Sequence, residues 1–410
     1  MLWLIFIVLG LASPQVELEL EQGESDFVSG NMAGAILHWS SALELARHED
    51  DKDAQVETLL RLASAHRRSG GLAKAQLMLD EVSQRAVEPP QLAQLHLGRG
   101  LLHLARRDCQ GAETQLREAF RLFQSLNDPP GAANAAYNLG VVRLKQGRHS
   151  GAKEAFEAAL VLFESLADPA GVADVNYSRA RLAWRMGDLG EARQLLDQVL
   201  RSYRELGDLL GSVDALSLSG LVEQDLGQVA SARNLLEQAL QIAQECEDVA
   251  RQATILHQLA TLHHQAGEQQ RALQFYELSE STWADVGDEG KRLSVSLSKV
   301  ALLSNKRAHY LEILQSARKL KDRRTEAVAS LNLAALLRDT QRQEAEKHLQ
   351  RAEELSTTLE LSEVKWRVAY ERGKAEVESN DLELGLAKLR EAVGILEETR
   401  LGVDRKNRAN

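Results

Sequence analysis

Two short stretches of the sequence carry side chains that could hold a peptide. Asn138 supplies an amide, which offers a hydrogen-bond donor and an acceptor together. Arg181 and Arg185 supply guanidinium groups, which bind a carboxylate through two parallel hydrogen bonds. The alternative is a solvated helical face on which these arginines pair with Asp174 or Asp214. Further polar and aromatic candidates surround the three residues: Asn134, Tyr137, Lys145, Tyr177 and Trp184.

Histidines are densest at His257, His263 and His264. His257 and His264 are seven residues apart and share one helical face, near Gln258, whereas His263 points elsewhere. Two histidines on one helix without a carboxylate set are a weak metal site, so we expect His257 and Gln258 to be polar groove residues and expect no metal or cofactor. The sequence has no Gly-x-Ser-x-Gly, P-loop or His-Glu-x-x-His motif, so we expect no enzyme activity.

The elements that must position these residues repeat every 40 residues. Aspartates recur at this interval, and glycines and alanines recur in step with them: Asp128, Asp168, Asp208, Asp248, Asp288; Gly147, Gly187, Gly227, Gly267; Ala152, Ala192, Ala232, Ala272. A constant period is typical of a stacked-repeat protein. Proteins of that kind usually hold another molecule on a surface.

One repeat reads as two helices joined by a turn. Small and apolar residues at three- and four-residue spacing predict a first helix over 131–144 and a second over 152–163. The glycine of the turn permits the left-handed backbone that ends a helix, and the recurring aspartates suit helix caps. The small residues Gly140 and Ala152 mark the place where two helices cross closely.

The pattern extends in both directions with drift. It predicts an all-α chain of about nine helical hairpins over 17–398, with a possible irregular junction at 291–320 and a polar tail over 399–410 that frays.

The segment Tyr137-Asn138-Leu139-Gly140, followed by Ala152, Phe156 and Ala159, resembles the tetratricopeptide repeat, in a long-period form. The resemblance implies a right-handed superhelical solenoid whose first helices line a concave face. It also implies a scaffold that binds another protein or an extended peptide on that face. The alternative is a peptide-sensing or regulatory subunit of a signalling or peptidase system. Ser178 and Leu218 replace asparagines that some peptide-gripping relatives use.

A second resemblance lies near the C-terminus. Residues 363–373 and 389–400 are similar to the repeat region that precedes a CHAT-type peptidase domain in some bacterial proteins. This similarity implies a bacterial source.

Composition narrows the class of partner. Lys plus Arg is 49 and Asp plus Glu is 60, so the net charge is −11, which argues against sequence-independent nucleic-acid binding. We expect no small-molecule substrate. Cys109 and Cys246, the two cysteines, lie more than three repeats apart, and we expect no disulfide.

The first residues form an apolar run, Leu2 to Ala12, that Ser13-Pro14 ends. The run is too short to cross a bilayer as a helix but suits the core of a secretory signal, so residues 1–13 are read as a signal peptide. We therefore expect a protein exported from a bacterial cell, periplasmic or secreted. The alternatives are a cytoplasmic protein, or membrane attachment through this segment if it stays uncleaved.

Overall fold

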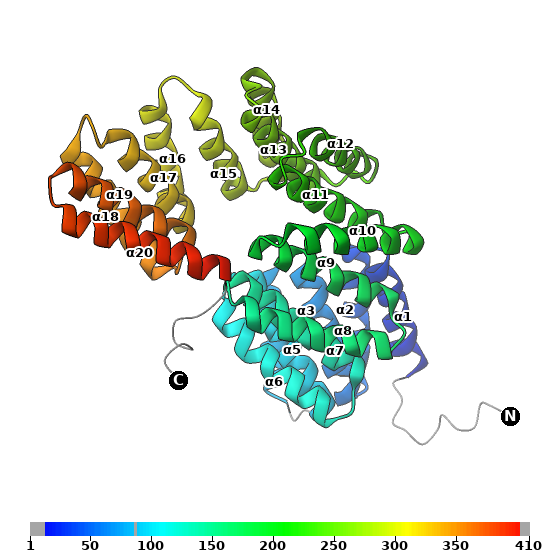
Figure 1. Cartoon of the computed structure of the whole chain (residues 1–410). Coiled ribbons are helices and arrows are strands. Elements are labelled where there is room, and N and C mark those ends of the chain that lie inside the picture. The colour runs from blue at the N-terminus through cyan, green and yellow to red at the C-terminus, as the bar shows by residue number, and fades with distance from the viewer. Residues whose placement is uncertain (1–12, 86–87, 402–410) are drawn as a thin grey trace. The chain divides into compact units, whose positions relative to one another are not determined.

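The computed structural model describes residues 13–85 and 88–401, and within these ranges the regular elements are twenty α-helices and one 3₁₀ turn (Figure 1). The helices are α1 Pro14–Val28, α2 Met32–His48, α3 Lys52–Arg68, α4 Leu72–Ser83, α5 Pro89–Ala105, α6 Cys109–Ser125, α7 Pro129–Lys145, α8 His149–Ser165, α9 Pro169–Met186, α10 Leu189–Leu206, α11 Leu209–Asp225, α12 Val229–Glu245, α13 Val249–Gln265, α14 Gln269–Val286, α15 Glu289–Lys299, α16 Lys306–Leu320, α17 Arg323–Leu337, α18 Arg342–Thr358, α19 Ser362–Glu378 and α20 Leu382–Leu401. The predicted all-α class is confirmed.

Consecutive helices form hairpins, as α7 with α8 and α13 with α14 show (Figure 1). The twenty described helices make ten such pairs, one more than the sequence pattern suggested. The chain divides into two compact units, Met1–Val175 and Asn176–Asn410, and the division falls within α9. Each unit is treated separately below.

The recurring aspartates cap the first helices, as predicted. Asp128 Oδ1 accepts a hydrogen bond from the backbone N–H of Gly131 at 3.0 Å, and Asp208 Oδ1 accepts one from Gly211 at 2.8 Å. Asp168, Asp248 and Asp288 make the equivalent bond at 2.9, 2.8 and 2.9 Å. Each carboxylate satisfies an amide that the helix leaves without an internal partner.

Glycines end the first helices in the regular part of each unit. Gly147, Gly187, Gly227 and Gly267 have φ of 74°, 83°, 77° and 78°, in the left-handed region. Glycine enters this region without the steric penalty of a side chain. The turns therefore keep a constant length, and each second helix starts at the same offset.

The predicted small residues lie at helix crossings. Ala152, Ala192, Ala232 and Ala272 are fully buried. A methyl group added to Gly140 would lie 2.5 Å from the Phe156 ring, closer than unbonded atoms approach. Small side chains at these positions let α7 and α8 pack tightly, and the predicted register is confirmed.

Residues 291–320 lie in the eighth of the ten described hairpins, α15 with α16, whose first helix is shortened. α15 has 11 residues, against 17 in most first helices, and the 3₁₀ turn Val300–Leu302 follows it. Leu303 then has extended backbone before α16 begins. This hairpin lacks the pair of small residues that marks the helix crossing in the other hairpins. The sequence pattern therefore did not predict it as a hairpin.

The structure describes only part of the predicted signal peptide and of the predicted polar tail. α1 begins at Pro14, where the Ser13 hydroxyl accepts from the backbone N–H of Val16, and α20 continues to Leu401. Residues 1–12, which hold most of the predicted signal peptide, lie outside the described residues, as do residues 402–410 of the predicted tail. Cys109 and Cys246 are free thiols.

Candidate functional site

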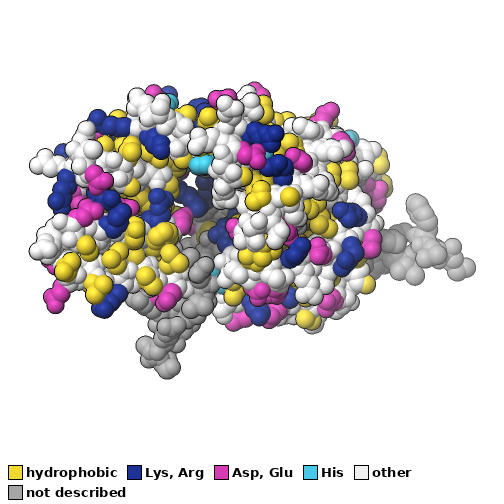
Figure 2. Space-filling model, turned by 45° about the horizontal axis from the view of Figure 1, so that its top comes forward, with side chains coloured by type: hydrophobic (Ala, Val, Ile, Leu, Met, Phe, Trp, Pro, Cys, Tyr) yellow, Lys and Arg dark blue, Asp and Glu magenta, His cyan; other side chains and the backbone are white. Residues whose placement is uncertain are grey.

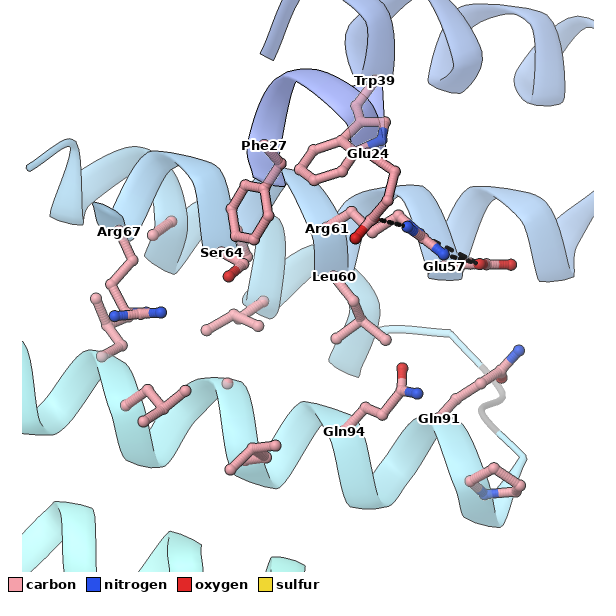
Figure 3. A pocket seen from close by; sticks show the side chains of 18 of the residues that line it. Glu24, Phe27, Trp39, Glu57, Leu60, Arg61, Ser64, Arg67, Gln91 and Gln94 are labelled. Atoms are coloured by element: carbon pink, nitrogen blue, oxygen red, sulfur yellow. Dashed lines mark hydrogen bonds and ion pairs between the residues drawn. The ribbon is translucent and has the colours of Figure 1, made fainter. Parts of the chain in front are cut away.

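The first unit contains a groove of about 560 Å³ (Figure 3). Its lining comes mainly from three first helices, α1, α3 and α5: Glu24, Phe27, Asp53, Glu57, Leu60, Arg61, Ser64, Arg67, Gln91, Gln94, Leu97, Gly98 and Leu101. Trp39 of α2 and Leu79 of α4 close its inner side. A concave site of this size, apolar with a few polar groups, is the usual form of a ligand site.

Helical periodicity explains why α3 presents these side chains. Leu60, Ser64 and Arg67 recur at three- and four-residue steps and line the groove, whereas Leu59 and Leu62 of the same helix are buried in the core. On α5, Gly98 lies where an added methyl group would come 3.1 Å from the Leu79 side chain. The missing side chain therefore helps to keep the groove open between α3 and α5.

The groove has an acidic end, where three carboxylates lie near a single arginine. Arg61 Nη2 donates to Glu57 at 2.8 Å, and Arg61 also binds Glu24 of α1 (Figure 3). Gln91 Nε2 donates to Asp53 at 3.1 Å, which links α5 to the start of α3. Three carboxylates therefore face one arginine at this end, and the local charge is negative.

The other end holds Arg67, whose situation differs. The side chain is half-buried and extends toward α5 (Figure 3). Within the described ranges it has no hydrogen bond and no ion pair. Burial, with the neighbouring charge of Arg68, lowers the pKa of Arg67 from its ordinary value. A guanidinium still carries its proton at any physiological pH, so Arg67 is a partly desolvated cation without a counter-ion.

The predicted site residues of the first unit lie elsewhere, on α7. Asn134 Nδ2 donates to the Pro130 carbonyl at 3.0 Å, and Asn138 Nδ2 donates to the Asn134 carbonyl at 2.7 Å. Tyr137 lies 6.2 Å from the Phe156 ring, and Lys145 is exposed. Each asparagine side chain thus already donates a hydrogen bond to a carbonyl of its own helix. A bound peptide would have to use the remaining polar atoms or replace these bonds.

Four predicted residues of the second unit lie on α9. The Arg181 guanidinium is 6.0 Å from the Tyr177 ring centroid, and Trp184 Nε1 donates to Asp225 at 2.7 Å. Burial and the charge of Arg181 lower the pKa of Arg185. Asp214, considered as a partner for these arginines, instead binds Arg251 through two hydrogen bonds of 2.9 Å.

The remaining predicted residues, on α13, are built into contacts between hairpins. His257 Nε2 lies 3.1 Å from Ser298 Oγ, and Gln258 Oε1 accepts from Ser217 at 2.7 Å. Burial, and then the charge of Lys291, lower the pKa of His257, so the imidazole is neutral at pH 7. His263 faces away, buried and paired with Glu268 at 2.7 Å. Within residues 13–85 and 88–401, no cluster of three metal-ligating side chains occurs.

The groove residues of α3 were not among the predicted site residues, although they occupy the same positions in their repeat as the residues predicted on α7. The residues predicted on α7 precede Gly140 by six, three and two positions (Asn134, Tyr137 and Asn138) or follow it by five (Lys145). The same offsets from Ala63 give Glu57, Leu60, Arg61 and Arg68, and the first three of these line the groove. The predicted grouping of Asn138 with Arg181 and Arg185 draws on both units and stays a prediction.

Comparison with known proteins agrees with the helical hairpins. The family model described as tetratricopeptide repeat matches residues 91–165, 131–205, 171–245 and 211–282. These overlapping matches cover α6 to α13 completely and most of α5 and α14. Residues 91–282 therefore consist of tetratricopeptide repeats. The resemblance predicted from Gly140, Ala152 and Phe156 is therefore confirmed; the similarity to the CHAT-associated region stays a prediction.

Solved structures share the helical-repeat fold of this chain at low sequence identity. A Rap protein complexed with competence and sporulation factor is 13% identical, with a TM-score of 0.63 over 95% of this chain and 99% of that one. NprR in complex with its cognate peptide NprX is 14% identical, with a TM-score of 0.59 over 83% and 99%. Aspartyl phosphate phosphatase F from Bacillus subtilis is 12% identical, with a TM-score of 0.53 over 65% and 70%. No curated protein matches the sequence. Among the described helices, none has the length and apolar character needed to span a bilayer.

Proposed function

We propose that this protein binds an extended peptide, or a peptide-like segment of another protein, in the groove formed by α1, α3 and α5. The observation that carries the proposal is the half-buried, unpaired Arg67 in a concave, largely apolar site. First helices of successive hairpins line the groove, so a peptide lying along α3 meets side chains of both α3 and α5. Gln94 supplies an amide that can bond to a peptide backbone.

The comparisons support this class of ligand. Two proteins with the same fold are described as complexes with competence and sporulation factor and with a cognate peptide, NprX. The surface charge also favours a protein or peptide over nucleic acid. Figure 2 shows basic side chains interspersed with acidic ones on the face drawn, and the net charge is −11. Nucleic-acid binding needs a continuous basic surface.

We propose that binding is not coupled to catalysis by this chain. The groove places no nucleophile beside a general base, and the sequence lacks the catalytic motifs named above. One protein of the same fold is described as an aspartyl phosphate phosphatase, so the assay must cover that reaction. Release of phosphate from an aspartyl phosphate by the purified protein, above the spontaneous rate, would contradict the proposal.

A peptide-sensing regulator is the second candidate. Two proteins with the same fold are described as a quorum sensor, NprR, and as a conjugation gene regulator, a Rap protein. A sensor must have two conformations, and its peptide must bind one of them more tightly. A ligand with equal affinity for both conformations does not change their populations. Small-angle scattering with and without peptide separates the two candidates: a sensor becomes more compact, and a scaffold keeps its radius of gyration.

Peptide capture tests the shared part of both candidates. The purified chain is incubated with a randomised heptapeptide library, and retained peptides are identified by mass spectrometry. The proposal expects a set of related sequences that bind with measurable affinity by calorimetry. Retention of no peptide above a bead control would remove the proposed function.

We also propose export from a bacterial cell, on the strength of the apolar run Leu2 to Ala12. Fractionation of the native host, with N-terminal sequencing of the protein, tests this. A cytoplasmic protein that keeps its first twelve residues would contradict it.

A further inference from the structure

We propose that the groove of α1, α3 and α5 binds its peptide in one direction, with a carboxylate of the peptide on Arg67 and a cationic group near Asp53 and Glu57. This inference rests on the proposed function and specifies the ligand: a short peptide with an anionic end, an apolar middle and a cationic end.

The guanidinium of Arg67 is half-buried in the groove. A guanidinium that has lost part of its hydration gains most from an anion that restores its hydrogen bonds. Within the described ranges no carboxylate of the chain does so. Arg68 does not share this situation, because it is exposed and lies over the Phe27 ring at 4.5 Å. The free binding capacity of Arg67 therefore faces the groove.

The middle of the groove is apolar. Leu60 of α3 and Leu97 and Leu101 of α5 line it, and they leave apolar surface open between the helices. An apolar side chain of the peptide would cover this surface and displace water from it. Ser64 and Gln94 lie on the same two helices and offer polar contacts to the peptide backbone (Figure 3).

The end of the groove opposite Arg67 is acidic. Glu24 and Glu57 share a single arginine, Arg61, and Asp53 accepts only from the neutral Gln91, so three negative charges stand against one positive charge there. Opposite charges at the two ends of the groove favour a ligand whose charges are arranged in reverse. Asp53 and Arg67 are fourteen residues apart on one helix, about 21 Å at the usual rise. An extended chain of about six or seven residues spans that distance.

The test uses the full chain and four forms of the heptapeptide library: unmodified, C-terminally amidated, N-terminally acetylated, and both. We expect wild-type protein to prefer free acids over amides by about tenfold or more, since a charge-assisted bidentate contact is lost on amidation. Arg67→Met keeps most of the side-chain stem and should abolish this preference. Arg99→Met is the matched control, because Arg99 lies on α5 outside the groove and has its own partner, Asp80, at 3.6 Å; it should keep the preference.

The outcomes separate the inference from the function on which it rests. No retained peptide in any form would remove the proposed function. Peptides retained equally as acids and amides, and equally by Arg67→Met, would leave the function and overturn the inference. Amidated peptides retained only with Asp or Glu near the C-terminus, and lost in Arg67→Met, would support a side-chain carboxylate as the anion.

Direction is tested with a photoreactive group on the C-terminal residue of a selected peptide. Labelling of the α5 segment around Leu101 is expected, and labelling around Gln91 would overturn the proposed direction. If Arg67→Met does not fold, as judged by circular dichroism, the amidated and acid libraries on wild-type protein still decide the question.

Discussion

Arg148 binds the carboxylate of Glu113 through both of its terminal nitrogens, at 2.6 and 2.8 Å. The two residues are 35 positions apart: Glu113 lies on α6, and Arg148 lies in the turn between α7 and α8. The Glu113 side chain is only 2% exposed. Arg117 and Arg143 bind the same carboxylate, at 3.1 and 3.4 Å. One buried acid thus joins two consecutive hairpins of the first unit.

Replacing Glu113 with Gln should lower the free energy of unfolding by about 1–3 kcal/mol at pH 7, because hydrogen bonds to a charged group are lost. Urea unfolding followed by circular dichroism measures the change. Glu154→Gln is the matched control, since Glu154 is exposed on the adjacent helix α8; we expect a change within about 0.5 kcal/mol. Equal stability of the two variants would mean that the buried contact contributes nothing.

The same contact predicts a pH dependence. Burial opposes ionisation of Glu113, but the hydrogen bond and charge of Arg148 outweigh it, so its pKa lies below the ordinary value of 4.5. A lowered pKa in the folded state means that the stabilisation is complete above the ordinary pKa and is lost as pH falls through the lowered one. The stability gap between wild type and Glu113→Gln should therefore narrow below about pH 4.5. A gap that stays constant down to pH 3 would contradict the assignment.

Ala192→Phe should overpack the crossing of α9 and α10 and cost about 1–3 kcal/mol or more, because Ala192 is fully buried. Gln194→Phe adds the same ring to an exposed position of α10 and should leave the melting temperature nearly unchanged. Indistinguishable melting curves for the two variants would reject the register of the repeat.

Asp208→Ala should cost about 1 kcal/mol through loss of the cap on α11. Asp208→Asn should restore most of that stability, since the asparagine oxygen also accepts from the Gly211 amide. Asp197→Ala, at an exposed position of α10, controls for the loss of charge. Thermal unfolding of the three variants decides between a capping role and a purely electrostatic one, in which Asn would behave like Ala.

Arg181→Glu combined with Arg185→Glu should weaken capture of a partner while leaving helicity and melting nearly unchanged, if α9 contributes to binding. Arg201→Glu with Arg204→Glu makes the same change of charge on the exposed surface of α10 and is the control. Pull-down from the native host, with circular dichroism of both variants, measures the effect. A large loss of stability in the first variant alone would instead assign Arg181 and Arg185 a structural role.

The sequence by itself determined the features that depend on nearby residues. Asp208 and Gly211 are three positions apart, so a cap between them is local and recurs wherever the same spacing recurs. Ala192 had to be small because hairpins of equal length bring their helices together at equal offsets. For the same reason the irregular hairpin of α15 and α16, which lacks the spacing, was visible only as a break in the pattern.

Only the tertiary structure decided which charged residues have partners. Glu113 and Arg148 looked like ordinary surface charges, and the fold buries one against the other across two hairpins. Nothing in the sequence distinguishes Arg67 either, and the fold leaves it half-buried beside α5, where no acid of residues 13–85 or 88–401 forms an ion pair with it. Helical periodicity tells which way a side chain points, but not which atoms of another helix it meets there. That depends on how the helices pack, which is why the candidate groove emerged from the structure and the repeat from the sequence.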